Sequence, residues 1–247
     1  MSILAVIPAR YASTRFPAKP LVMIEGKPMI QRTYESALRC KFFSKVIVAT
    51  DDERIAHAVQ SFGGEVELTR TEHQTGTDRI AEVASRHPDY EVIVNIQGDQ
   101  PFISPEALEK LIEPYLRDEL PEMTTVACPL DMLSGYRDEH TVKVICNQKL
   151  RAMYFSRAPI PFFRNAVHNP PVYHHIGLYA FRRDFLFFYA MLPPSPLEQA
   201  ESLEQLRALE NGYTIQVGLI STPILEINTP DDLAKVHLLI KTGALTL

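Results

Sequence analysis

The sequence predicts an α/β protein with a Rossmann-like, doubly wound and mostly parallel sheet. Three short apolar runs have the composition of strands buried on both faces of such a sheet, namely residues 3–7, 45–49 and 91–96. Helix signals follow two of them. Thr50 with Glu53 has the form of a capping box, and residues 104–106 place a cap, a proline and an acid at a helix start. Strands alternating with helices at these spacings indicate the doubly wound class.

The second half of the chain is predicted to contain strands and helices in a less regular order. Expected strands are 124–129, 142–146, 151–155 and 177–182. Expected helices are 201–209 and a last helix from Thr229 to about Lys241. A proline-rich span, residues 158–172, is interpreted either as an ordered arm or as a plain surface loop.

Composition excludes several classes of protein. The chain has 247 residues, 46% hydrophobic and 22% charged, which suits one soluble unit or a core domain with a smaller lobe. No run approaches the ~18–20 apolar residues of a membrane-spanning helix. A net charge of −5 argues against non-specific nucleic-acid binding. The three scattered cysteines, Cys40, Cys128 and Cys146, fit neither a disulfide framework nor a zinc site, so we expect a reducing, cytoplasmic compartment.

The loop after the first predicted strand, residues 8–20, concentrates positive charge in an acidic protein. It contains Arg10, Arg15 and Lys19 with two hydroxyls, but no glycine, so it matches neither the dinucleotide fingerprint nor the P-loop. Guanidinium groups pair with phosphate oxygens through two parallel hydrogen bonds, and lysine adds a point charge. These residues suit a triphosphate, although a solvated basic loop has the same composition.

Two further loops carry polar residues where ligands bind in open α/β sheets, at the carboxyl ends of strands. Residues 97–101 place Asp99 just past a strand, where a carboxylate can hold Mg²⁺, although Gly-Asp is also a frequent structural turn. Residues 74–77, Gln-Thr-Gly-Thr, suit close approach to a base and ribose, or a capped helix start at Thr77.

Taken together, these segments resemble the 3-deoxy-manno-octulosonate (Kdo) cytidylyltransferases, also called CMP-Kdo synthetases, over nearly the whole chain. The stretches that carry the resemblance are IPARYASTRFPAKPL (7–21), VATDDERI (48–55), TEHQTGTDR (71–79), VNIQGDQP (94–101), HTVKVI (140–145), MYFSRAPIP (153–161), HHIGLYAFR (174–182) and SLEQLRALENG (202–212). The resemblance implies an enzyme that activates Kdo with CTP for lipopolysaccharide biosynthesis and releases pyrophosphate.

The resemblance also implies residue roles. The expected CTP-binding residues are Ala9, Arg10, Ser13, Arg15, Lys19, Gln74, Thr75, Gly76 and Thr77. The expected sugar-binding residues are Gln97, Arg157, His175, Tyr179, Glu204 and Gln205. The expected Mg²⁺ ligands are Asp99 and Asn228, and the expected catalytic residues are Arg10, Lys19 and Asp99. Without the resemblance, His175 would be interpreted as a hydrogen-bonded strand histidine and Glu204 as part of a solvated helix face.

The implied organisation is one catalytic domain, residues 1–247, that acts as a homodimer. Residues 1–120 would mainly bind CTP, and 121–220 would mainly bind the sugar and form the dimer. Residues 221–247 would carry the metal-site loop and the last helix. The implied reaction is in-line attack of the sugar's anomeric hydroxyl on the α-phosphorus. The sequence identifies no residue as a dedicated general base, and a metal that lowers the pKa of the hydroxyl would make one unnecessary.

Three positions depart from the family pattern. Ala18 replaces a glycine, and its β-carbon disfavours positive φ, which predicts a slightly different loop shape. Gln100 replaces a glutamate. Asn228 replaces the aspartate that would be the second metal carboxylate, which predicts weaker metal binding; Asp231 and Asp232 either substitute for it or only cap the last helix.

Two rival functions remain open. One is CMP activation of another acidic sugar, such as 8-amino-Kdo or a sialic acid, although the sugar-side match favours a Kdo-type acid. The other is a non-catalytic nucleotide-sugar sensor whose metal site has decayed. Gln100 and Asn228 are the support for the sensor, whereas Arg10, Lys19, Asp99 and Arg157 oppose it.

Overall fold

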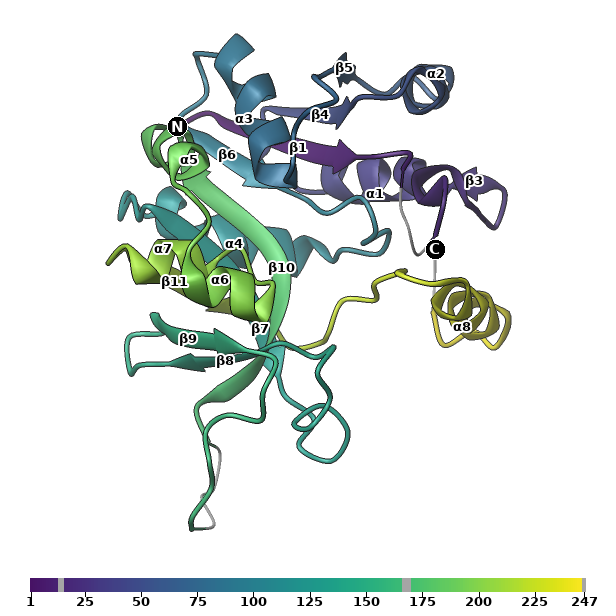
Figure 1. The fold of residues 1–247 in the computed structure, drawn as a ribbon. Coiled ribbons are helices and arrows are strands. Elements are labelled where there is room, and N and C mark those ends of the chain that lie inside the picture. The colour runs from purple at the N-terminus through teal and green to yellow at the C-terminus, as the bar shows by residue number, and fades with distance from the viewer. Residues whose placement is uncertain (13–15, 166–169, 246–247) are drawn as a thin grey trace. The chain divides into compact units, whose positions relative to one another are not determined.

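The structure is a computed structural model that describes residues 1–12, 16–165 and 170–245 (Figure 1). The chain divides into two compact units. The first comprises residues 1–108 and 224–247, and the second comprises residues 109–223. The last 24 residues therefore return to the first unit. None of the helices within these ranges is long and apolar enough to cross a membrane.

The first unit is built on a parallel sheet with the strand order β6-β1-β4-β5. Its elements are β1 (Ile3–Ala9), a short 3-10 helix (Lys19–Leu21), β2 (Met23–Ile24), β3 (Lys27–Pro28), α1 (Met29–Leu38), β4 (Lys45–Thr50), α2 (Glu53–Ser61), β5 (Val66–Leu68), α3 (Gly76–Arg86), β6 (Val92–Asn95) and α8 (Pro230–Lys241). In the register of the sheet, Ala5 lies opposite both Val46 and Val94. The central strand β1 is almost completely buried, as the apolar runs predict.

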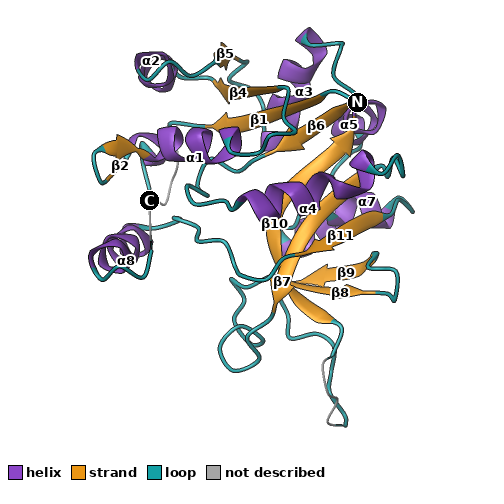
Figure 2. Cartoon of the chain, turned by 180° about the vertical axis from the view of Figure 1, so that it is seen from behind, coloured by secondary structure: helices purple, strands orange, loops and turns teal. Residues whose placement is uncertain are grey.

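Helices cover both faces of this sheet. Figure 1 shows α3 in front of β1 and β6, and the reverse view in Figure 2 shows α1 in front of β1. The two helices are strongly amphipathic, and each buries an apolar stripe that includes Ile30 and Ala37 of α1 and Ile80 and Val83 of α3. The doubly wound class predicted from the sequence is confirmed.

The returning C-terminal segment has its own small core in the first unit. Ile227 and Val236 are buried with Ile24 and Met29. The backbone N–H of Ile227 donates to the Asp99 carbonyl at 3.0 Å, which ties this segment to the loop after β6.

The second unit contains a mixed sheet in which β7 lies between β10 and β11. Its elements are β7 (Met123–Pro129), β8 (Lys143–Cys146), β9 (Ala152–Ser156), β10 (Val172–Arg182), α5 (Arg183–Met191), α6 (Pro196–Glu201), α7 (Leu206–Glu210) and β11 (Ile215–Leu219), and α4 (Pro105–Leu116) leads into it from the first unit. Strand β10 pairs antiparallel with β7 and β8, while β11 pairs parallel with β7. Strands β8 and β9 form a hairpin that continues from β10.

Some local predictions need correction. Helix α2 is capped by Asp52, not by Thr50, because Thr50 is the buried last residue of β4 and its hydroxyl accepts from the Asp52 N–H. The helix expected over 201–209 is broken at Ser202, which has φ 52° and separates α6 from α7. The described parts of the proline-rich span contain no helix or strand before Val172, and they extend away from β8 and β9 (Figure 1).

Candidate functional site

Three loops of the first unit meet around Pro8, at the carboxyl end of β1. A β-carbon built on Gly98 would lie 3.1 Å from the Pro8 carbonyl oxygen, and one built on Gly76 would lie 3.3 Å from the Pro8 ring. Both glycines therefore allow a close approach that a larger residue would obstruct. The loop after β1, the start of α3 and the loop after β6 are thereby brought together, as expected for a ligand site of an open α/β sheet.

The loop after β1 is closed by its own backbone. The Ala18 N–H donates to the Tyr11 carbonyl at 3.1 Å, and the Lys19 N–H donates to the Phe16 carbonyl at 3.2 Å. Ala18 adopts φ 56° and ψ 22°, the left-handed conformation that its β-carbon disfavours. Ala9 is the buried last residue of β1. Ser13 and Arg15, both predicted to bind CTP, lie outside the described residues.

Arg10 is partly exposed, and among the described residues its side chain has no hydrogen bond or ion pair. An arginine without a carboxylate partner leaves a positive charge available to a ligand. Tyr11, the next residue, lies under the Arg54 guanidinium at 3.3 Å, which fixes the first part of the loop against α2.

Helix α3 begins at this site. Thr75 caps it, and the capping box closes with Asp78, so the cap lies two residues before the predicted start at Thr77. Thr77 is buried and Gln74 is exposed. The first N–H groups of a helix lack intrahelical acceptors and carry positive potential, which favours an anion at Gly76.

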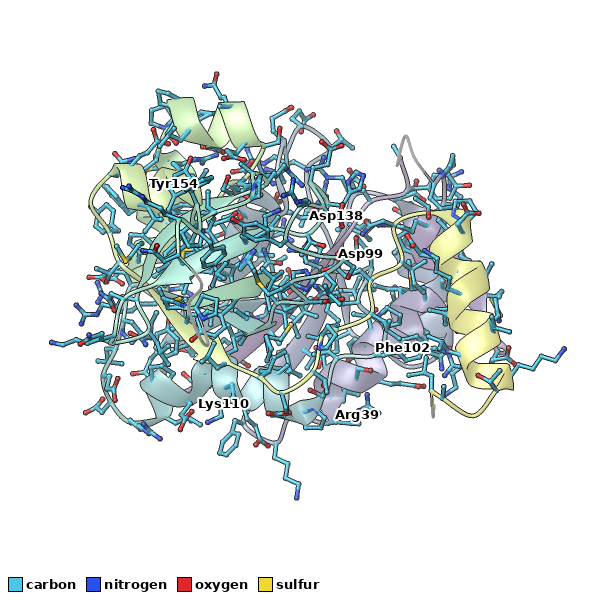
Figure 3. All side chains as sticks on the ribbon, turned by 90° about the horizontal axis from the view of Figure 1, so that it is seen from below. Arg39, Asp99, Phe102, Lys110, Asp138 and Tyr154 are labelled. Atoms are coloured by element: carbon cyan, nitrogen blue, oxygen red, sulfur yellow. The ribbon has the colours of Figure 1, made fainter. Side chains whose placement is uncertain are left out.

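Asp99 and Lys19 form the charged centre of the first unit. The Lys19 ammonium donates to Asp99 at 2.7 Å and to the side-chain oxygen of Asn228 at 3.4 Å. Asp99 and Phe102 of the same loop are labelled in Figure 3. Helix α1 supports this loop, because the hydroxyls of Thr33 and Ser36 donate to the carbonyls of Gly98 and Pro101 at 3.2 and 2.8 Å. Gln97 is partly exposed and donates weakly to Asn95 at 3.5 Å.

Sequence reasoning missed Glu226, a second carboxylate at this centre. Gln100 donates to Glu226 at 2.9 Å, and the Asn228 amide donates to it at 3.3 Å. Removal of the carboxyl from water raises the pKa of Glu226, and the nearby negative charge of Asp99 raises it further. The available signal was its position two residues before Asn228 in the same loop.

The oxygen donors suit Mg²⁺, which takes one or two carboxylates together with substrate phosphates. Asp99 and Asn228 each direct a side-chain oxygen toward the Lys19 ammonium, so two oxygen donors already face one cation. The Gln100 side-chain oxygen is buried and has no hydrogen-bond partner, so a hydrated ion could donate to it. No group of three histidine, cysteine, aspartate or glutamate side chains suited to a metal occurs in the described ranges. Asp232 closes the capping box of α8 with Thr229, so it has the capping role and not that of a substitute metal ligand.

The second unit holds five of the six predicted sugar-binding residues. Arg157 follows β9, and its side chain donates to the carbonyls of Glu201 at 2.8 Å and Glu139 at 3.0 Å. Its backbone N–H donates to the Glu201 carboxylate at 2.9 Å. No carboxylate within the described part of this unit forms an ion pair with the Arg157 guanidinium. The Arg157 guanidinium is thus oriented by neutral carbonyls, and its positive charge remains available to an anionic ligand.

His175 of β10 is buried and uncharged. Its Nε2 lies 3.0 Å from the Thr125 hydroxyl, and its ring packs edge-on against Phe155 at 4.8 Å. Burial lowers the pKa of His175 to about 3, and the neighbouring His174 adds to this shift. These contacts are those of a hydrogen-bonded strand histidine, and the sugar contact expected for His175 stays a prediction.

Tyr179 and Glu204 lie near Tyr189, and Gln205 follows Glu204 in the chain. The Tyr179 ring contacts His175 at 5.6 Å, and the Tyr189 hydroxyl donates to the Glu204 carbonyl at 2.6 Å. Gln205 is 3% exposed, and its side-chain nitrogen has no hydrogen-bond acceptor. A buried amide with an unused donor is costly unless a ligand or water accepts from it.

Lys143 is a second residue that sequence reasoning missed. It is fully buried, and its ammonium donates to the carbonyls of Asp138, Thr141 and Arg157 at 2.8, 2.6 and 2.5 Å. Burial lowers the pKa of Lys143 below its ordinary value. The lysine joins the loop that contains Asp138, labelled in Figure 3, to the backbone of Arg157.

The parallel sheet of the first unit and the cationic loop at its strand ends define a nucleotide-binding α/β protein. The model of the cytidylyltransferase family matches residues 4–215. The 3-deoxy-manno-octulosonate cytidylyltransferase of Acaryochloris marina is 56% identical over 243 residues, covering 98% of this chain and 99% of the relative. That of Synechococcus elongatus is 53% identical and covers 95% of this chain and 96% of the relative. The chain belongs to the 3-deoxy-manno-octulosonate cytidylyltransferase family.

Solved structures agree with this assignment. A CMP:2-keto-3-deoxy-manno-octonic acid synthetase complexed with CTP matches with a TM-score of 0.93 and 42% identity, covering 98% of this chain and 100% of that chain. The 4-diphosphocytidyl-2C-methyl-D-erythritol synthase of Anaerococcus prevotii matches with a TM-score of 0.61 at 16% identity, covering 97% of this chain and 98% of that chain, which shows a shared fold.

Proposed function

We propose that this enzyme transfers CMP from CTP to Kdo and releases pyrophosphate, as a step of lipopolysaccharide biosynthesis in the cytoplasm. The observation that carries the proposal is the full-length similarity to Kdo cytidylyltransferases, including 56% identity over 98% of the chain. Two cationic features in the structure agree with it. One lies at the strand ends of the first unit, and the other is Arg157 in the second unit.

The first unit is proposed to bind CTP. Arg10 and Lys19 supply positive charge for the phosphates, and the start of α3 at Gly76 supplies backbone N–H groups. Lys19 pairs with Asp99 in the structure, and its ammonium, which has three N–H donors, would also contact a phosphate oxygen when CTP binds.

The second unit is proposed to bind the sugar. Arg157 would hold the carboxylate of Kdo, because a planar guanidinium matches a planar carboxylate and its orientation is already set by two carbonyls. Gln205 offers an unused buried donor to a sugar hydroxyl. Gln97, Tyr179 and Glu204 are assigned to the acceptor site by the resemblance.

The reaction would be an in-line displacement at the α-phosphorus of CTP. The anomeric hydroxyl oxygen forms the new P–O bond as the bond to pyrophosphate breaks, and the hydroxyl proton is lost to solvent. Arg10 and Lys19 neutralise charge on the leaving pyrophosphate, while Arg157 orients the nucleophile. Asp99 and Asn228 would hold Mg²⁺, which would supply a counter-charge for phosphate oxygens. His175 is too weak a base for this step, because its pKa is about 3.

We also propose that the enzyme is a homodimer that uses the proline-rich span. Phe162 is 88% exposed, and Leu133, in another loop of the second unit, is 97% exposed. Large apolar side chains in open loops are favoured at interfaces. Light scattering after gel filtration would measure the mass directly, and a monomer at micromolar concentration would contradict this assignment.

Pyrophosphate release tests the proposed reaction. We expect turnover with CTP and Kdo, and much less with a sialic acid in place of Kdo. Preference for 8-amino-Kdo would reassign the acceptor, and absence of release with every acidic sugar would favour the nucleotide-sugar sensor.

Arg10→Ala and Lys19→Ala test the phosphate assignment. Each variant loses a charge that opposes the developing charge of pyrophosphate, so we expect kcat to fall about 100-fold or more. Arg183→Ala, which removes an arginine from α5 of the second unit, serves as the control. Wild-type rates in both variants would exclude the loop as the phosphate site.

A further inference from the structure

The charges around Asp99 are balanced without Glu226. Asp99 carries one negative charge, and the Lys19 ammonium at 2.7 Å offsets it. Asn228 and Gln100 are neutral amides. A divalent cation gains little electrostatic attraction from a pocket with no net charge. The two amides alone would therefore leave the metal dependent on the phosphates of CTP.

Glu226 changes this balance. Its carboxylate is hydrogen-bonded by both amides, from Gln100 at 2.9 Å and from Asn228 at 3.3 Å. Asn228 thus bridges the two charged groups, because its oxygen faces Lys19 and its nitrogen faces Glu226. Although neighbouring groups partly withdraw the Glu226 carboxyl from water, the residue is exposed, so a hydrated ion can reach it.

Gln100 provides an independent sign that a ligand belongs here. Its nitrogen is committed to Glu226, which fixes the orientation of the amide. Its oxygen is consequently left without a partner although the residue is completely buried. Such an oxygen requires a donor, and Mg²⁺ usually keeps several water molecules that can donate.

We propose that Glu226 supplies the second carboxylate of the divalent-cation site. It would thus provide the negative charge that the neutral amide of Asn228 does not. The inference rests on the proposed function for the identity of the nucleotide that shares the ion. Glu226 and Asp99 carry the negative charge, while Asn228 and Gln100 position the two carboxylates. Metal binding is then preserved without an aspartate at residue 228.

Binding of Mn²⁺ tests this assignment without reference to turnover. Free Mn²⁺ is measured by electron paramagnetic resonance in protein with saturating CTP and no sugar. We expect Glu226→Gln to weaken Mn²⁺ binding about 10- to 100-fold, because a ligand or a group beside one is lost. Adding Asn228→Asp to Glu226→Gln should restore most of the affinity by returning a carboxylate to the same loop.

Asp231→Asn is the matched control, because it removes the same charge from an exposed position nearby in the chain. Equal Mn²⁺ affinity in wild type and Glu226→Gln would overturn the proposal, as would an equal loss in Asp231→Asn. CTP binding in EDTA should be unchanged in all variants, which separates a metal defect from unfolding. Failure of wild type to release pyrophosphate with Kdo would refute the proposed function while leaving the Mn²⁺ result valid.

Discussion

Ala18 has a backbone conformation that its own side chain disfavours. The sequence predicted that the β-carbon would change the loop shape, yet the residue takes φ 56° in the left-handed region. The Ala18 N–H is held by the Tyr11 carbonyl, and its carbonyl accepts from Leu21 at 2.9 Å. Loop closure therefore outweighs a local cost of about 1–2 kcal/mol.

Replacing Ala18 by glycine should stabilise the protein by about 1 kcal/mol. Glycine removes the left-handed strain but adds conformational freedom to the unfolded chain, so only part of the strain is recovered. Urea unfolding measures the difference. Ala12→Gly in the same loop is the control and should give no stabilisation; a less stable Ala18→Gly would contradict the interpretation.

His175 should make the protein sensitive to mild acid. Its pKa is about 3 in the folded protein, against an ordinary value of 6.5, so below pH 6.5 the unfolded chain binds a proton that the folded chain excludes. Stability should therefore be complete above pH 6.5 and fall by about 1.4 kcal/mol per pH unit down to pH 3.

Urea unfolding at pH 7 and pH 5 checks this in wild type and His175→Gln. The glutamine variant should lose less stability between the two pH values, while the exposed His57→Gln control should follow wild type. The stability of His175→Gln should still fall somewhat with pH, because burial also lowers the pKa of His174. Identical slopes in wild type and His175→Gln would show that His175 is not excluded from protonation.

Among the elements, the loops of the two candidate sites are held by groups from neighbouring segments. Ile227 buries its side chain with Met29 and donates its N–H to Asp99, so packing of the C-terminal segment sets the place of Glu226 and Asn228. In the second unit, Lys143 of β8 performs a similar task for the backbone of Arg157.

Lys143→Met should destabilise the protein by about 2–4 kcal/mol. Three carbonyls lose their donor, although relief from burying a charge offsets part of this cost. As a positioning residue for Arg157, Lys143 should affect the KM for Kdo more than the KM for CTP.

Steady-state kinetics at a temperature where the variant is folded measure this split. Lys149→Met, which removes an exposed lysine near the same hairpin, is the control. A Lys143→Met enzyme with both KM values unchanged would show that the lysine is structural only.

Across the whole molecule, stability comes from buried apolar surface without covalent links. All three cysteines are free and buried. Burial raises the pKa values of Cys128 and Cys146 to about 11, which suppresses their thiolate forms at neutral pH. The cysteines thus act as small core residues, in agreement with the prediction that they form no disulfide framework.

The thiols should consequently react with Ellman's reagent only after unfolding. At pH 8 the native protein should show slow reaction, whereas in guanidinium chloride all three thiols should react rapidly. The melting temperature should be the same with and without a reducing agent. Rapid modification of one thiol in the native state would contradict the burial of that cysteine.

The sequence by itself determined the family and the parallel sheet, and it placed the polar and cationic residues of the candidate site directly after the strands. Buried parallel strands have continuous apolar runs, and the residues of such a site follow them directly, so both are visible in local order. The start of α8 was likewise predictable, because Thr229, Pro230 and Asp232 form a complete local cap.

Only the tertiary structure decided which distant groups share one site. Asp99, Glu226 and Asn228 meet because the C-terminal segment returns to the loop after β6, a contact between residues more than a hundred positions apart. The break at Ser202 and the burial of His175 and Lys143 depend equally on packing, since no local pattern reveals which polar groups the fold removes from water. The order of residues along the chain specified the helices, the strands and the polar residues that follow them. Burial and hydrogen bonds between distant segments decided which groups each charged residue contacts.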